Sequence, residues 1–185
     1  GLAARGLAFY GVERRPAPYE PLSKPRQELR ELSRYRDTLV AQRTALKNRR
    51  REKSTSKVVS QMQTRQLRQL NDDIGSIEKG MLRVINEDED FKRDFALLNT
   101  IPGVGPITAM TVLAEIGDLR RFERARQLTA YAGVTPRVIE SGSSVRGRTH
   151  MCKRGNERVR HALYLSAMAT LNTKQPNSLS LMHRR

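Results

Sequence analysis

An apolar stripe that recurs every three or four residues through a highly charged stretch is the feature that most constrains the fold of this sequence. Its members are Leu67, Leu70, Ile74, Ile77, Met81 and Val84. This spacing places all of them on one face of a helix and is typical of a coiled-coil seam. A looser stripe of Leu29, Leu32, Leu39 and Leu46 precedes it, and a charged, serine-containing break near residues 51–56 separates the two. The pattern predicts an antiparallel helical hairpin or coiled coil over residues 27–92.

Such a seam needs a surface to pack against, and two partners are open. The second helix could pack against the first helix of its own chain. It could also pack against a second protomer, which would make the protein a homo-oligomer through the coiled coil. Gly75 and Gly80 each weaken the second helix by about 1 kcal/mol relative to alanine, so packing must stabilise it in either case.

The rest of the chain divides into three further segments. Residues 1–26 begin with small side chains and then carry four prolines, which break regular structure and predict an extended linker. Residues 93–172 have the pattern of a small helical domain, and residues 173–185 form a polar tail. The predicted fold class is mainly α: a long helical hairpin or coiled coil, then a small helical domain with a helix-hairpin-helix and an irregular Ser-Gly loop.

The charge of the chain indicates a polyanionic partner. Its 35 Lys and Arg against 19 Asp and Glu give a formal net charge of +16. Nucleic acid is the commonest polyanion, so DNA is the predicted partner. No membrane is expected, because no apolar run approaches the ~20 residues that span a bilayer and no secretory signal begins the sequence. The lone cysteine, Cys152, fits a reducing compartment, and the predicted location is the bacterial or archaeal cytoplasm, at the nucleoid.

Local signals mark helix ends and argue against a metal site. Gly133 is predicted to end one helix, and Asn156 to cap the last one. The acidic run at residues 87–90 resembles the clustered carboxylates of a two-metal nuclease, but neighbouring side chains on a helix point in different directions. We therefore predict a solvated acidic turn and no metal ligands in this chain.

A first candidate binding site is the run Ile101-Pro-Gly-Val-Gly-Pro106. Two glycines permit a tight turn between helices, and Pro106 suits the first position of the helix that follows. The amides of Gly103 and Gly105 could approach a DNA phosphate at the start of that helix. We expect Ile101 and Val104 to anchor the turn in a core with Leu97, Leu98, Val112 and Leu113. The alternative is a tight interhelical turn with no ligand.

The second candidate site is the loop Glu140-Ser-Gly-Ser-Ser-Val-Arg-Gly147. Serine hydroxyls, a glycine-hinged backbone and surrounding cations are what a phosphodiester reaction needs: a nucleophile, hydrogen-bond donors and charge. Ser141 is the candidate nucleophile. The candidate DNA-binding residues beside it are Arg137, Ser143, Ser144, Arg146, Arg148, Lys153 and Arg154. From the residues alone, a flexible basic loop that only binds phosphates is equally open, because no base is evident beside the serine.

Four motifs in order make a family resemblance specific. They are Ile101-Pro-Gly-Val-Gly-Pro106, Tyr131-Ala-Gly-Val-Thr-Pro-Arg137, Glu140-Ser-Gly-Ser-Ser-Val-Arg-Gly147 and Lys153-Arg-Gly-Asn156 with Arg160. Together they resemble the transposase domain of the bridge-RNA-guided insertion-sequence recombinases. In that family a helical coiled coil joins an N-terminal RuvC-like DEDD nuclease domain to a C-terminal transposase domain. The resemblance covers roughly residues 5–170.

The resemblance implies a mechanism and partners. It makes Ser141 the nucleophile that forms a covalent phosphoserine link to DNA. It also implies a structured guide RNA, and Mg²⁺ held by the RuvC-like domain, which this sequence lacks; no cofactor is expected in the chain itself. The chain is expected to be a truncated copy, with residues 1–20 as the exit helix and linker that follow the nuclease domain. The alternative is a catalytically inactive DNA- or RNA-binding and oligomerisation module.

Overall fold

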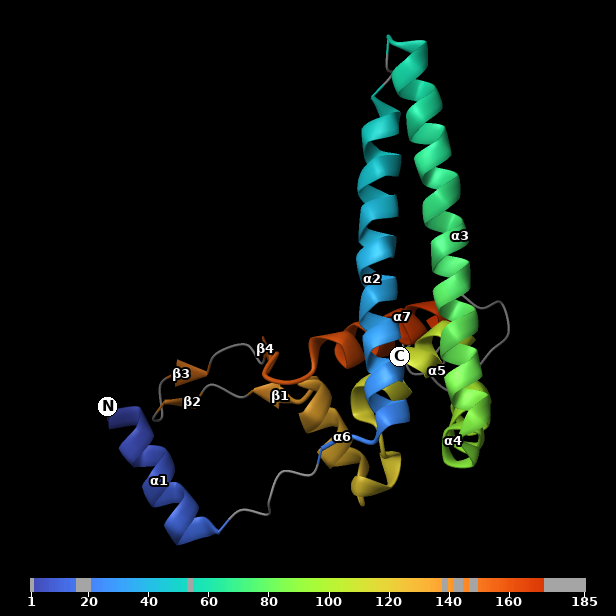
Figure 1. Ribbon diagram of the computed structural model, residues 1–185. Helices are drawn as coiled ribbons and strands as arrows, with labels where there is room; N and C mark the ends of the chain where they lie inside the picture. Colours follow the sequence, from blue (N-terminus) through green and yellow to red (C-terminus); the bar gives the residue numbers. More distant parts are fainter. Residues whose placement is uncertain are drawn as a thin grey trace.

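The structure is a computed structural model and is mainly helical, as predicted (Figure 1). It describes residues 2–15, 21–52, 55–137, 140–141, 145–146 and 150–171. A two-helix hairpin projects from a smaller body, and a short β-ribbon leaves the body on one side (Figure 1). Over the described residues, no helix is both long enough and apolar enough to cross a membrane.

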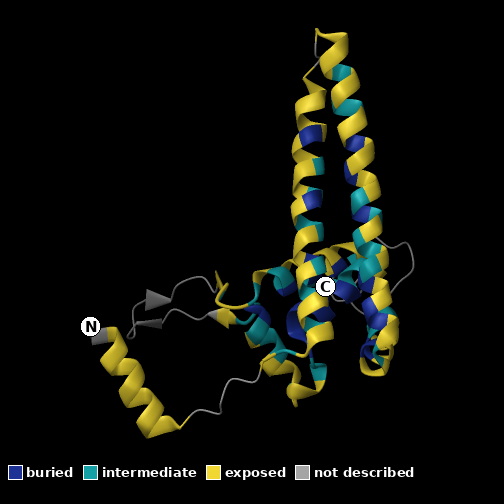
Figure 2. Ribbon diagram, viewed as in Figure 1, coloured by how far each residue is buried: buried dark blue, intermediate teal, exposed yellow. Residues whose placement is uncertain are grey.

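The hairpin consists of α2 (Lys24–Arg51) and α3 (Lys57–Glu87), the longest helices of the described chain. The predicted seam is confirmed, since five of its six members are buried and Ile77 is partly buried. The seam packs against Leu29, Leu39 and Leu46 of α2 (Figure 2). Of the two partners left open, the chain's own first helix therefore occupies the seam. Homo-oligomerisation stays a prediction, but this seam no longer argues for it.

The expected N-terminal linker is partly helical. Helix α1 spans Leu2–Arg14, and its described side chains are exposed (Figure 2). The extended-linker prediction was wrong for this stretch because no proline precedes Pro16, while leucine, alanine and arginine favour helix. Residues 16–20 lie outside the described part of the chain. Helix α2 then begins at Lys24 with Pro25 in its first turn, where a missing amide is harmless.

The body is built around α5 (Pro106–Ile116), which buries seven of its eleven residues. One core cluster packs its Met110, Leu113 and Ala114 against the base of the hairpin and α4 (Glu89–Asn99). A second cluster packs Val112 and Ile116 against α6 (Ala125–Ala132) and α7 (Glu157–Leu171). A 3₁₀ turn, η1 (Leu119–Arg121), lies between α5 and α6. Because α5 belongs to both clusters, the hairpin and the body share one continuous core.

The helix ends follow the predicted signals. Gly133 ends α6 in the left-handed conformation, with φ of 70°. The Asn156 side chain accepts hydrogen bonds from the amides of Arg158 (3.0 Å) and Val159 (3.1 Å) at the start of α7. The acidic run is a helix boundary: Asp88 lies between α3 and α4, and its carboxylate accepts from the Phe91 amide at 3.0 Å.

The segment between α6 and α7, expected to be irregular or briefly extended, contains four strands of two residues each. Strand β1 (Pro136–Arg137) pairs antiparallel with β4 (His150–Met151), and β2 (Glu140–Ser141) pairs antiparallel with β3 (Val145–Arg146). The two pairs form two separate two-stranded sheets, which we together call the ribbon. The expectation of an irregular loop missed this pairing, since strands of two residues carry almost no periodicity to read.

Gly75→Ala should stabilise the hairpin. A Cβ at this position of α3 meets nothing within 4 Å, so alanine adds helix propensity without a clash. We expect the free energy of unfolding to rise by about 1 kcal/mol in urea denaturation. The matched control is Gly133→Ala, where φ is +70° and the new Cβ would lie 2.8 Å from the Arg154 carbonyl oxygen; this variant should lose stability. A Gly75→Ala protein no more stable than wild type would contradict the described packing of α3.

Candidate nucleic-acid interface

The ribbon brings the backbone of several candidate residues together. In β2–β3, Ser141 pairs with Val145 and Glu140 with Arg146, while in β1–β4 Arg137 pairs with His150. Ser141 thus lies in the pair nearest the end of the ribbon. The side chains of Arg137, Ser141 and Arg146, and all of Ser143, Ser144 and Arg148, lie outside the described part of the chain. Their predicted roles therefore remain predictions.

Lys153 and Arg154 lie at the base of the ribbon, where the chain returns to the body. The Lys153 amide donates to the Gly133 carbonyl at 3.0 Å, and its φ of 55° turns the chain sharply. A Cβ on Gly133 would lie 2.8 Å from the Arg154 carbonyl oxygen, so a glycine is required there. Arg160 adds a further tie, with its Nη1 donating to the Ala132 carbonyl at 3.0 Å. Lys153 and Arg154 are both exposed on this fixed backbone and are free to meet a ligand.

The glycine turn between α4 and α5 is held by α7. A Cβ on Gly103, whose φ is +84°, would lie 2.1 Å from Thr170 Oγ1 and 2.4 Å from the Ser166 carbonyl oxygen. The Thr170 hydroxyl also donates to the Pro102 carbonyl at 3.0 Å. Close packing on α7 therefore accounts for glycine at position 103, whether or not a ligand binds. Gly105 is different, since nothing lies within 4 Å of a Cβ built there.

The predicted anchors of this turn are only partly right. Val112 and Leu113 are buried, and Leu98 and Val104 are half-buried. Leu97 and Ile101, however, are 60% and 48% exposed. The contacts with α7 replace the apolar anchor that was expected from these two side chains, and they could not be anticipated because α7 lies about 65 residues further along the chain.

The two candidate sites lie at opposite ends of α7. The glycine turn meets Thr170 in its last turn, whereas the ribbon joins the chain just before Asn156 at its start (Figure 1). At 1.5 Å per residue these points are about 20 Å apart. The two candidate sites are therefore separate parts of the body.

A buried carboxylate that the sequence analysis missed joins four helices beside these sites. Glu115, at the end of α5, has a side chain only 1% exposed. Arg34 of α2 binds it with two hydrogen bonds, Nε to Oε1 at 2.9 Å and Nη2 to Oε2 at 3.1 Å. Asn156 Nδ2 donates to Oε2 at 3.0 Å, and Tyr131 of α6 donates its hydroxyl to the Glu115 carbonyl at 3.0 Å.

This environment keeps Glu115 ionised. Burial by itself would raise the pKa of the Glu115 carboxyl, but the hydrogen bonds from Arg34 and Asn156 outweigh it, so the pKa lies below its ordinary value. No sequence signal marks the pair, because Arg34 and Glu115 are separated by 81 residues.

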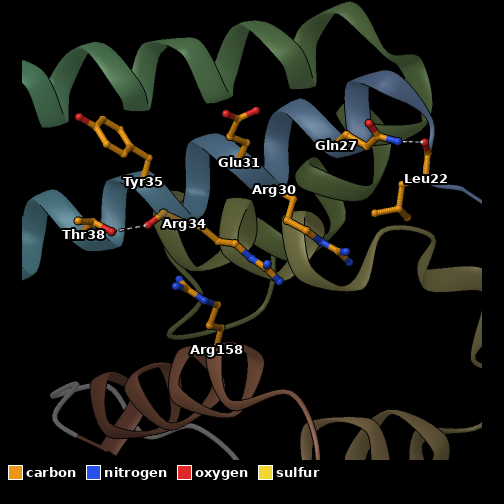
Figure 3. Close-up of a pocket in the computed structure, with 8 residues that line it drawn as sticks. All are labelled: Leu22, Gln27, Arg30, Glu31, Arg34, Tyr35, Thr38 and Arg158. Atoms are coloured by element: carbon orange, nitrogen blue, oxygen red, sulfur yellow. Dashed lines mark hydrogen bonds between the residues drawn. The ribbon is translucent and has the colours of Figure 1, made fainter.

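Three arginines surround a groove of about 600 Å³ next to this carboxylate (Figure 3). Arg30 and Arg34 of α2 point toward α7, and Arg158 points back at them, whereas Glu31 and Tyr35 leave the other side of α2 (Figure 3). Arg30 donates to the carbonyls of Ala114 (3.2 Å) and Glu115 (3.1 Å).

The charge of this groove is nearly balanced. Arg158 pairs with Asp37, and Arg34 pairs with Glu115. Glu31 also lines the groove. Three carboxylates thus accompany the three guanidinium groups, so the groove is a well-held junction between helices and has no surplus charge for a polyanion.

The part of the chain that carries both candidate sites is similar to known proteins. The fold there is a basic helical body with a glycine turn and a β-ribbon. Residues 95–183 match the family described as the Transposase IS116/IS110/IS902 family. This match begins within α4 and includes α5, α6 and α7.

The names of individual relatives describe proteins of a related kind. The pilin gene-inverting proteins of Moraxella bovis and Moraxella lacunata are each 30% identical to the chain over 162 residues, which is 88% of this chain and 50% of theirs. The transposase for insertion sequence element IS1111A of Coxiella burnetii is 39% identical over 98 residues, 53% of this chain and 26% of that protein. The chain spans about half the length of the two Moraxella relatives.

Glu115→Gln should destabilise the fold strongly. The substitution leaves the guanidinium group of Arg34 without its carboxylate and puts an amide donor against other donors. Removing one partner from a buried pair typically costs about 3 kcal/mol, and the half-exposed Arg34 lowers this to about 2 kcal/mol. The matched control is Glu28→Gln, which removes the exposed pair with Arg83 and should change the free energy of unfolding by less than about 1 kcal/mol.

The effect should depend on pH in a defined direction. The pKa of Glu115 is lowered in the folded state, so its stabilisation is fully present above its ordinary value of 4.5 and disappears as pH falls through the folded pKa. The stability difference between wild type and Glu115→Gln should therefore shrink in acid. Equal differences at pH 7 and at pH 3 would show that the charge of Glu115 is not what stabilises the junction.

Proposed function

We propose that this chain is the DNA-handling part of an insertion-sequence transposase or recombinase. The observation that carries the proposal is the match of residues 95–183 to a transposase family, over the segment that holds the ribbon and the glycine turn. The relatives' names, pilin gene-inverting protein and transposase, describe proteins that rearrange DNA. A net charge of +16 supplies the attraction for a DNA backbone.

The proposed contacts with DNA lie at both ends of α7. Lys153 and Arg154 lie exposed at the ribbon base. Arg137, Arg146 and Arg148 are further proposed phosphate-binding residues. At the other end, the amides of Gly103 and Gly105 donate no hydrogen bond within the described part of the chain. They precede the first turn of α5, whose amides add to a favourable field for phosphate. Contacts of this kind hold a duplex in place without reading its sequence.

The proposed reaction is strand exchange through a phosphoserine intermediate. The hydroxyl oxygen of Ser141 attacks a DNA phosphorus, loses its proton, and forms a P–O bond while a deoxyribose oxygen leaves with a proton. A deoxyribose hydroxyl of the new partner strand then attacks the same phosphorus and releases the serine. The number of phosphodiester bonds is conserved, so no nucleotide hydrolysis is needed. The arginines of the ribbon would stabilise the charge on the phosphoryl oxygens.

The Mg²⁺ of the proposed reaction does not fit this chain. Within the described residues, no three His, Cys, Asp or Glu side chains are grouped to hold a metal ion. Its proposed ligands are carboxylates of a RuvC-like domain. A structured guide RNA and a second copy of the chain are further proposed partners.

The second candidate function is binding without catalysis. It is favoured by one feature of the sequence: no base is evident beside Ser141. In that case the same surfaces would hold DNA or RNA, and the serine hydroxyl would only donate to phosphate. The two functions differ in whether a covalent protein–DNA bond ever forms.

Ser141→Ala distinguishes the two functions. With the RuvC-like domain of a relative added in trans, together with its structured RNA and Mg²⁺, wild type should form a protein–DNA adduct that survives denaturing electrophoresis. Ser141→Ala should abolish the adduct while DNA affinity changes less than about twofold, because one neutral hydroxyl contributes little to phosphate binding. Ser144→Ala is the matched control and should retain the adduct. An adduct that persists in Ser141→Ala assigns the chemistry to another residue.

DNA binding should weaken steeply with salt. If six or more phosphates are contacted, affinity for a short duplex should fall by about 10³-fold or more between 50 and 200 mM salt. The reason is that Lys and Arg side chains release salt counterions from DNA when they bind it. Fluorescence anisotropy with a labelled duplex measures this directly. A nearly flat dependence would contradict the electrostatic basis of the proposed function.

A further inference from the structure

The hairpin is electrically polarised along its length. Residues 41–70, its outer half, contain nine Lys or Arg and one acidic residue. The cations are Arg43, Lys47, Arg49, Arg50, Arg51, Lys53, Lys57, Arg65 and Arg68, and the acid is Glu52. Residues 71–90, which return to the body, contain seven acidic residues and two basic ones. The positive charge of the hairpin is therefore concentrated at the end that points away from the body (Figure 1).

The fold leaves this charge unneutralised. None of the described Lys or Arg side chains between 41 and 70 forms an ion pair; the hairpin's own ion pairs, such as Arg36–Glu78 and Arg83–Glu28, all lie nearer the body. Arg43 donates only to the amide oxygen of Asn71, at 3.2 Å. Like charges three and four residues apart repel each other on a helix, so this arrangement is unfavourable without an anion.

Helix capping does not account for the cluster. Cations in the last turn of α2, Arg49–Arg51, do complement the helix dipole. Lys57, however, begins α3, where a cation opposes the dipole, and Arg65 and Arg68 lie in the interior of that helix. Their side chains are exposed, as are those of Lys47 and Arg49–Arg51. A role outside the hairpin's own stability is needed to explain them.

The geometry of the tip suits a nucleic-acid backbone. Lys47, Arg50 and Arg51 line a shallow groove of about 290 Å³ with Leu67, which is buried between the two helices. Val40 of α2 lines a groove together with residues of α5 and α7, and from there the helix extends a further 11 residues to Arg51, or about 16 Å. That length matches about five base pairs of a duplex, at 3.4 Å per phosphate along a strand.

The composition favours a duplex over single strands or a membrane. Residues 41–70 contain no Phe, Tyr or Trp, so they offer no aromatic platform on which unpaired bases could stack. The same absence removes the aromatic anchors typical of helices that lie in a membrane interface. The apolar seam of the hairpin is also already buried within the chain.

We propose that residues 41–70, which we call the basic arm, bind the phosphate backbone of a double-stranded nucleic acid at a site separate from the ribbon and the glycine turn. This inference rests on the proposed function, because it assumes that the body also handles nucleic acid. The basic arm would hold a second duplex segment, or the continuation of the same one, at a distance from Ser141. Its recognition would be of charge and spacing, without sequence preference.

The test removes three charges from the arm in the full chain. The arm variant is Arg49→Gln/Arg50→Gln/Arg51→Gln. The matched control is Arg83→Gln/Lys92→Gln/Arg93→Gln, which removes three exposed cations from the acidic part of the chain near the body. The control and the arm variant therefore have the same net charge. Binding to a short duplex DNA, to duplex RNA of the same sequence, and to anionic phospholipid vesicles is measured over a range of salt.

The salt slope is the slope of −log K against log salt concentration, where K is the association constant. We expect the arm variant to lower this slope by about 0.9 for each phosphate that the arm no longer neutralises. Three arginines therefore correspond to a decrease of about 2.7, whereas the control should change the slope by less than about 0.5. A decrease confined to DNA or confined to RNA supports the arm and identifies its ligand. Because the arm variant also alters the end of α2, Arg65→Gln/Arg68→Gln serves as a second variant inside a helix and should lower the slope by about 1.8.

Failure of the arm and failure of the proposed function give different results. If Lys153→Gln/Arg154→Gln weakens duplex binding while both arm variants bind like the control, the basic arm is overturned and the proposed function stands. If wild type binds neither duplex in a salt-dependent way, the proposed function itself fails, and the arm with it. Weaker vesicle binding with duplex binding unchanged would also overturn the arm as a nucleic-acid site.

Discussion

The structure depends on the buried carboxylate of Glu115 and its ion pair with the half-exposed Arg34. Glu115 ends α5, the helix that belongs to both core clusters, and its carboxylate receives donors from α2 and α7. A buried carboxylate is unfavourable unless it is paired, so these helices must stay together for it to remain satisfied. The pair therefore sets the position of the hairpin relative to the body, and with it the positions of the ribbon and the glycine turn at the two ends of α7.

This arrangement separates the three surfaces that are candidates for binding a nucleic acid. The ribbon and the glycine turn lie about 20 Å apart along α7, and the basic arm extends from the body in a third direction (Figure 1). The groove beside Glu115 is lined by three arginines and Glu31, and two of these arginines pair with Glu115 and Asp37, so its charges serve to join helices. The net charge of +16 is thus distributed unevenly, and the positions of the charges indicate the surfaces that a polyanion would meet.

Sequence reasoning was most successful where the signal was local. The seam from Leu67 to Val84, the left-handed Gly133 and the Asn156 cap were all predicted and are confirmed. It failed at Ile101 and Leu97, which are exposed because α7 holds the glycine turn in their place. It also missed the pairing of β1 with β4 and of β2 with β3. The predicted role of Ser141 stays a prediction, since its side chain lies outside the described residues.

The amino-acid sequence by itself determined the helices, their ends and the polarity of charge along the hairpin, because periodicity, capping and composition act over a few residues. Only the tertiary structure decided that the seam is satisfied within the chain, that Gly103 is required by Thr170, and that Arg34 meets Glu115 across 81 residues. The physical reason is that burial and ion pairing depend on which surfaces meet in space. The spacing of residues along the chain does not show which surfaces meet.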